Sequence, residues 1–194
     1  MKHEITRADI LSPEAFEKVR KERRSDLIAK KRLRRIEVGP YAMFYFENYD
    51  TMWWQIHEML RIEKGGEEQI ADELQAYSPL VPNGRELVAT MMLEIDDSVR
   101  RDRVLRELGG VERAISIRIG ETAVQAVPEE DVERTKADGK TSSVHFMRFP
   151  FDEAAVAAFR KGGAPVLLAI DHAHYGHIAV IAPAVREALA ADFD

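Results

Sequence analysis

A cluster of histidines is the feature of this sequence that most directly suggests chemistry. Three of the six histidines lie in the run Asp171-His172-Ala173-His174-Tyr175-Gly176-His177, at the end of a predicted strand. Alternate side chains of an extended backbone project to one face, so His172 and His174 could reach one ion together. His177 could approach after the turn at Gly176, and Asp171 could bind the ion or orient a ligand through a hydrogen bond.

A fourth histidine, His145, lies inside another predicted strand, residues 143–149, and would approach the cluster if that strand pairs with residues 165–171. The chain has no cysteine, so any metal would be held by histidine, carboxylate or backbone oxygen. This ligand set suits a divalent transition metal, namely Zn, Fe, Ni or Mn. The candidate metal ligands are His172, His174, His177, His145 and Asp171. The alternative is that these histidines are polar residues that end a buried strand.

A second candidate site lies on the helix predicted at residues 51–64. Glu63 falls on the apolar stripe of this helix, where a carboxylate is costly unless it is paired or protonated. Glu58 and Glu63 could therefore form an acid–base set with His57. The alternative is that Glu63, in the last helical turn, reaches water. Arg148, in the predicted strand 143–149, completes the list of candidate catalytic residues.

The charge of the chain is unevenly distributed. Between Lys18 and Arg35 there are ten Lys/Arg and two acids, a local charge of +8, whereas the rest of the chain carries −14. A basic run can bind nucleic acid or an acidic partner. The acidic remainder would repel a polyanion, and no aromatic residues are interleaved for base stacking, which favours an acidic protein partner over nucleic acid. The alternative is a solvated helix face.

Local signals predict the elements that must position these residues. Ser12-Pro13-Glu14 is a good helix start, because serine can cap, proline tolerates the first turn and glutamate favours the positive end. Helices are expected at 13–33, 51–64, 67–77, 97–108, 152–161 and 183–193, strands at 35–38, 41–47, 86–95, 111–119, 122–127, 143–149, 165–171 and 178–181, and a polar loop at 128–140.

The order of these elements predicts an α+β fold. Two strand–helix–strand units, separated by an extra strand and a loop, suggest a mixed or antiparallel sheet of split βαβ, ferredoxin-like type. The N-terminal helix and a β-hairpin would be appended to this sheet. We expect one domain over 1–194, with a basic helical arm at 1–34, the hairpin and two helices at 35–84, and the α/β sheet unit at 85–194.

Composition excludes several classes of protein. Hydrophobic residues make up 45% and charged residues 32%, as in soluble globular proteins. The N-terminus lacks the apolar stretch of a signal peptide and no apolar run could span a bilayer, so we expect a cytoplasmic protein without membrane contact. The phosphate-binding and dinucleotide-binding glycine motifs and the nucleophile elbow are all absent from the sequence.

Several stretches resemble the bacterial domain of unknown function 3501 family. They are Phe46-Glu47-Asn48, residues 55–63 (Gln-Ile-His-Glu-Met-Leu-Arg-Ile-Glu), residues 77–84 (Tyr-Ser-Pro-Leu-Val-Pro-Asn-Gly), residues 141–149 (Thr-Ser-Ser-Val-His-Phe-Met-Arg-Phe) and Ile170-Asp171-His172. The resemblance covers almost the whole chain but carries no established activity or catalytic residue. It implies a gene context of rubrerythrin-like and iron–sulfur oxidoreductase proteins, and hence a role near redox or peroxide metabolism.

Two functions from different classes remain open at this point. The first is an accessory protein without its own chemistry that binds a redox protein partner. The second is a metal-binding protein or metal-dependent enzyme that uses the His-rich strand end. The aromatic arm at 41–47 could also be an edge for homo-oligomer formation, or it could be covered by the adjacent helix.

Overall fold

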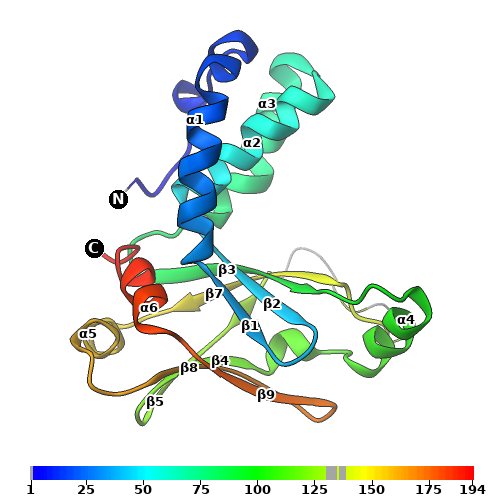
Figure 1. The fold of residues 1–194 in the computed structure, drawn as a ribbon, viewed down its shortest axis with the longest axis vertical. Helices are drawn as coiled ribbons and strands as arrows, with labels where there is room; N and C mark the ends of the chain where they lie inside the picture. The colour runs from blue at the N-terminus through cyan, green and yellow to red at the C-terminus, as the bar shows by residue number, and fades with distance from the viewer. Residues whose placement is uncertain (1, 130–134, 136–138) are drawn as a thin grey trace.

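Six α-helices and nine strands make up the described part of the chain in the computed structural model, which covers residues 2–129, 135 and 139–194 (Figure 1). The helices are α1 (Pro13–Arg32), α2 (Tyr49–Glu63), α3 (Gly66–Tyr77), α4 (Ser98–Glu107), α5 (Glu153–Lys161) and α6 (Pro183–Ala190). The strands are β1 (Arg35–Val38), β2 (Ala42–Glu47), β3 (Glu86–Leu93), β4 (Ile115–Ile119), β5 (Thr122–Gln125), β6 (Val127–Pro128), β7 (Val144–Pro150), β8 (Val166–His172) and β9 (Tyr175–Val180). Three short 3₁₀ turns are η1 (Arg7–Asp9), η2 (Ser78–Leu80) and η3 (Val111–Arg113).

The strands form two antiparallel sheets that face each other. The first sheet has the order β1-β2-β3-β7-β6 and the second has the order β5-β4-β8-β9. The chain passes from one sheet to the other between β5 and β6, so a single extended segment pairs first with β4 and then with β7. At the crossing, the Ala126 amide donates to the Ile115 carbonyl at 2.9 Å.

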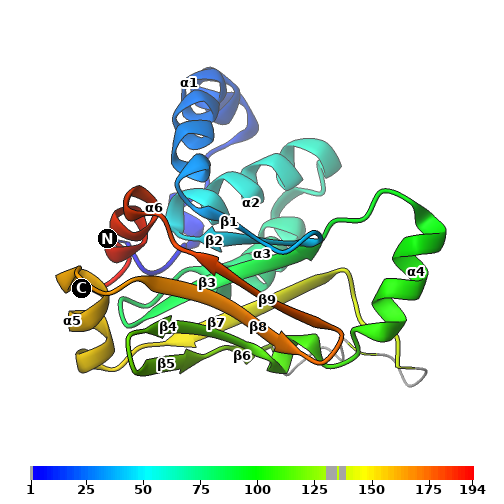
Figure 2. The same ribbon diagram turned by 60° about the horizontal axis from the view of Figure 1, so that its bottom comes forward.

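The main core lies between the two sheets. It is built from inward-facing side chains such as Phe44, Leu87, Ile117, Phe149 and Leu168, each of which is completely buried. Helices α5 and α6 cover one end of this sandwich, and α4 lies at the opposite end (Figure 2).

A helical layer covers the outer face of the first sheet. Val88 of β3 and Phe146 of β7 point away from the main core and pack with Met52 and Ile56 of α2. As a result, β3 is buried on both faces, and only one of its eight residues is exposed. Helices α1, α2 and α3 therefore project from the sandwich as a separate layer (Figure 1).

The α+β class is confirmed, but the split βαβ arrangement differs from expectation. The units β3-α4-β4 and β7-α5-β8 each connect one sheet to the other, because β3 pairs with β7 and β4 pairs with β8. The hairpin of β1 and β2 is part of the first sheet and not an appendage. Most of the loop predicted at 128–140 lies outside the described residues. In the described ranges, we find no helix with both the length and the apolarity needed to cross a bilayer.

Candidate functional site

The predicted metal ligands lie around the hairpin of β8 and β9. The register pairs His172 with Tyr175 and Ile170 with His177, so the turn falls at residues 173–174. His172 and His177 therefore face the same side as the buried Ile170. Asp171 faces the opposite side, where it forms an ion pair with Arg118.

The three histidines of this hairpin have different contacts and do not converge on one point. Nε2 of His172 lies 3.2 Å from the Gly109 carbonyl, and Nδ1 accepts the amide of His174 at 3.3 Å. The rings of His172 and His174 are 5.9 Å apart, whereas His177 packs edge-on against Tyr175 at 4.5 Å. Among the described residues, no group of three or more His, Asp or Glu could hold a metal ion. The structure therefore does not bring the five predicted ligands together.

His145 lies elsewhere, buried in the core next to β3. Its Nε2 lies 2.9 Å from the Ser142 carbonyl and 3.2 Å from the Thr141 hydroxyl, and its Nδ1 lies 3.9 Å from Oε2 of Glu112. Glu112 is 7% exposed, so a buried carboxylate accompanies this histidine. Sequence reasoning missed Glu112, because residues 111–113 read as the start of a strand and instead form the turn η3.

The predicted acid–base set is also dispersed. Glu58 accepts two hydrogen bonds from Arg20 of α1, at 2.6 and 3.1 Å, and these contacts lower the pKa of Glu58. Glu63 is exposed and accepts a hydrogen bond from Gln69 at 3.0 Å, which agrees with the alternative that it reaches water. Arg148 donates to Glu86 at 2.6 Å and to the Pro79 carbonyl.

Both ring nitrogens of His57 form hydrogen bonds with backbone groups. Its Nδ1 donates to the Trp53 carbonyl at 2.7 Å, and its Nε2 accepts the amide of Leu11 at 3.0 Å. This pattern requires a neutral ring with one proton on Nδ1. Burial lowers the pKa of His57 from its ordinary value of 6.5, which favours the same neutral form. His57 therefore attaches the segment before α1 to α2.

The neutral state of His57 predicts a pH-dependent stability. Because the pKa of His57 is lower in the folded chain, its contribution is complete above the unfolded pKa of 6.5 and is lost as the pH falls below it. The stability difference between the wild type and His57→Gln should shrink from about pH 8 to about pH 5, as measured by urea unfolding. His174→Gln, at an exposed ring, is the control. If the stability difference stayed the same over this pH range, the neutral state assigned to His57 would be contradicted.

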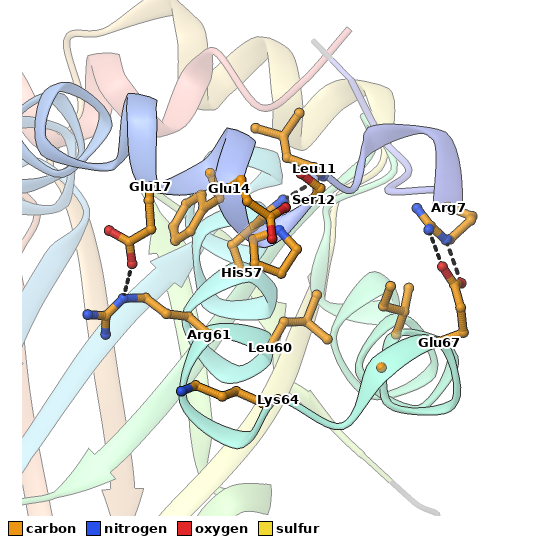
Figure 3. Close-up of a pocket in the computed structure, with 14 residues that line it drawn as sticks. Arg7, Leu11, Ser12, Glu14, Glu17, His57, Leu60, Arg61, Lys64 and Glu67 are labelled. Carbon is orange, nitrogen blue, oxygen red and sulfur yellow. Dashed lines mark hydrogen bonds and ion pairs between the residues drawn. The ribbon is translucent and has the colours of Figure 1, made fainter.

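A groove of about 680 Å³ opens between the three helices of the outer layer (Figure 3). Its apolar surface comes from Leu11 just before α1, Phe16 of α1, His57 and Leu60 of α2, and Ile70 of α3. These residues come from three separate stretches of the sequence, so no single stretch marks the groove.

Ion pairs frame the groove on two sides. Arg7 of η1 donates to both carboxylate oxygens of Glu67 at the start of α3, at 3.0 and 2.5 Å. Arg61 of α2 donates to Glu17 of α1 at 2.5 Å. Figure 3 shows the two pairs on opposite sides of Leu60 and His57. The rim of the groove therefore consists of charged side chains held by ion pairs, whereas its floor is apolar.

The basic run lies on α1 and is strongly solvated. Along α1, which is described in full, only Phe16 and Leu27 are buried. Arg20 and Lys30 form ion pairs with Glu58 and Asp50, and both of these acids belong to α2. The other cations of α1 are exposed and form no ion pair within the described part of the chain. They are Lys18, Lys21, Arg23, Arg24, Lys31 and Arg32.

A family model described as "Protein of unknown function (DUF3501)" matches residues 4–193. The chain belongs to the DUF3501 family. The family resemblance expected from the sequence is thus confirmed over nearly the whole length of this DUF3501 protein. No curated protein matches it.

The DUF3501 fold is supported by a solved structure. The chain is 40% identical to a novel protein of unknown function from Burkholderia pseudomallei K96243, whose crystal structure superposes with a TM-score of 0.89. The match covers 98% of this chain and 99% of that one. Neither comparison supports a redox or a metal role, since the family and the solved structure are both described as being of unknown function.

Proposed function

We propose that this protein is an accessory protein that binds an acidic partner protein through the exposed face of α1. The observation that carries the proposal is the group of six exposed cations on α1 that form no ion pair with the described residues, on a helix that is described in full and has only two buried residues. Exposed charges of one sign steer the association of proteins and select a partner with the opposite potential.

The surroundings of α1 favour a protein partner over nucleic acid. The aromatic residues beside the basic face are engaged: Phe16 packs against Trp53 and Trp54, Arg20 lies over Trp54, and Arg23 lies over Trp53. These rings are therefore occupied by the protein's own side chains and do not form a platform for bases. The charge of −14 outside the basic run adds a repulsive field toward a polyanion.

The partners to test first are redox proteins, the rubrerythrin-like and iron–sulfur oxidoreductase proteins that the family resemblance implies. Purified wild-type protein and the double variant Lys21→Glu/Arg24→Glu would be titrated against each of them. Both positions are exposed and form no ion pair among the described residues, so the loss of stability should be small, and circular dichroism melts check it. We expect the reversal to weaken binding at least about tenfold, and added salt to weaken the wild-type complex.

The control for this experiment changes the charge by the same amount elsewhere. Arg103 of α4 and Lys161 of α5 are exposed and lie outside the helical layer, so Arg103→Glu/Lys161→Glu should bind like the wild type. Equal loss of binding in both double variants would show that only net charge matters. Tight binding by the α1 variant would refute the proposal.

A further inference from the structure

The apolar groove and the basic face of α1 are continuous along one helix. Pro13, Glu14, Phe16 and Glu17 of α1 line the groove, and the cations without an ion pair in the described chain begin at Lys18. A helix of 20 residues is about 30 Å long, so a single partner segment could contact both surfaces.

Three helices border the groove. Its walls are the start of α1 and the start of α3, and α2 forms the floor between them (Figure 3). Three neighbouring helices with an apolar gap can be completed by a fourth helix that inserts its own apolar stripe. This is the recognition mode in which an amphipathic helix lies in a groove, with anchors three and four residues apart.

Charge decides which end of the partner is acidic. Two cation–carboxylate pairs neutralise most of the rim, and the remaining rim charges, Glu14 and Lys64, have opposite signs. The groove itself is therefore electrically balanced and selects apolar side chains. The preference for an acidic partner comes from the cations that follow along α1.

We propose that the groove receives an amphipathic helix of the partner and that acidic residues continuing from this helix lie along α1. This proposal rests on the proposed function, because it assigns the apolar anchor of the same acidic partner. The two contacts differ in their response to salt: the helical anchor is insensitive, whereas the charge contact is screened.

The test uses synthetic peptides as the probe. One peptide of about 20 residues places leucines three and four residues apart in a helical part and continues from it with glutamates, and the second has the same composition in scrambled order. The chain has two tryptophans, Trp53 and Trp54, and both contact Phe16 in the groove wall. Their fluorescence therefore reports occupancy of the groove through their contact with Phe16. We expect the amphipathic peptide to bind at least about tenfold more tightly than the scrambled one, including in about 1 M salt.

Matched variants on two helices identify the surface. Leu60→Gln alters the groove floor and Ile70→Gln alters a wall, and each should remove the difference between the peptides. Ile62→Gln lies on the same helix as Leu60 but is 65% exposed and outside the groove, so it should bind like the wild type. Circular dichroism melts establish that each variant is folded.

The outcomes separate the two proposals. If the wild type binds both peptides equally, or if both folded groove variants retain the difference, the groove proposal is overturned. If Lys21→Glu/Arg24→Glu then weakens both peptides alike, the acidic-partner proposal still stands. If the helical preference persists while this double variant changes nothing, the groove proposal stands and the role of α1 is refuted.

Discussion

Replacing Asp192 by alanine is expected to lower the free energy of unfolding by about 3–5 kcal/mol, because it leaves a buried charge without its counterion. Asp192 is 0% exposed and Arg34 is 4% exposed. The guanidinium forms a two-point contact with the carboxylate, in which Nη1 donates to Oδ1 at 3.1 Å. Arg34 also donates to the carbonyls of Phe46 and Glu47, so the pair joins the C-terminal end of the chain to β2.

An exposed ion pair elsewhere in the fold provides the control for this prediction. Asp171 pairs with Arg118, and their side chains are 56% and 35% exposed. Asp171→Ala should therefore cost no more than about 1 kcal/mol. Urea unfolding followed by circular dichroism measures both variants. Similar losses in the two variants would show that burial of the Arg34–Asp192 pair does not set its importance.

Phe16→Ala is the second substitution with a large expected effect, about 3–5 kcal/mol for the stability of the helical layer. Phe16 is 2% exposed and packs against Trp53 and Trp54 at 5.8 and 5.5 Å, and against the ring of His57 at 4.8 Å. It is one of two buried residues that hold α1 to the rest of the described chain. The substitution should release α1 locally without unfolding the sheets.

Hydrogen exchange measured by mass spectrometry distinguishes local from global loss. Amides of α1 should exchange faster in Phe16→Ala, while those of β3 and β7 keep their protection. Ile28→Ala, at a position on the same helix that is 49% exposed, should change little. Faster exchange across the whole chain would show that α1 is an integral part of the main core.

Most individual elements could be predicted because local signals coincide with the structure. Helix α1 begins after Ser12, whose hydroxyl accepts the Ala15 amide at 3.2 Å. Asn48 and Asp152 cap α2 and α5 in the same manner, at 3.1 and 2.7 Å. These interactions span three residues, so they can be read directly from the sequence.

The division into two sheets could not be predicted in this way. The order of strands and helices is the same whether a strand–helix–strand unit returns to one sheet or connects two. What decides the outcome is that β3 is covered on both faces, by the second sheet and by α2. The nearly continuous apolar sequence of β3 was consistent with such coverage but did not identify the covering elements.

The candidate sites depended on register, which explains why the histidine prediction differs from the structure. We expected the turn at Gly176, but the chain turns at residues 173–174 and β9 already begins at Tyr175. Because the turn comes earlier than expected, His177 pairs with Ile170 and its side chain lies on the opposite face from Asp171. The groove escaped prediction for another reason, since it forms where side chains distant in sequence meet.

The segment from β5 to β6 gives the two sheets a common strand. Neither sheet can separate from the other without breaking the hydrogen bonds that this segment makes with β4 or with β7. Damage to one ladder should therefore propagate to its neighbour, and the sandwich should melt in one cooperative step instead of two. A segment of only seven residues, 122–128, therefore couples the stability of the two sheets.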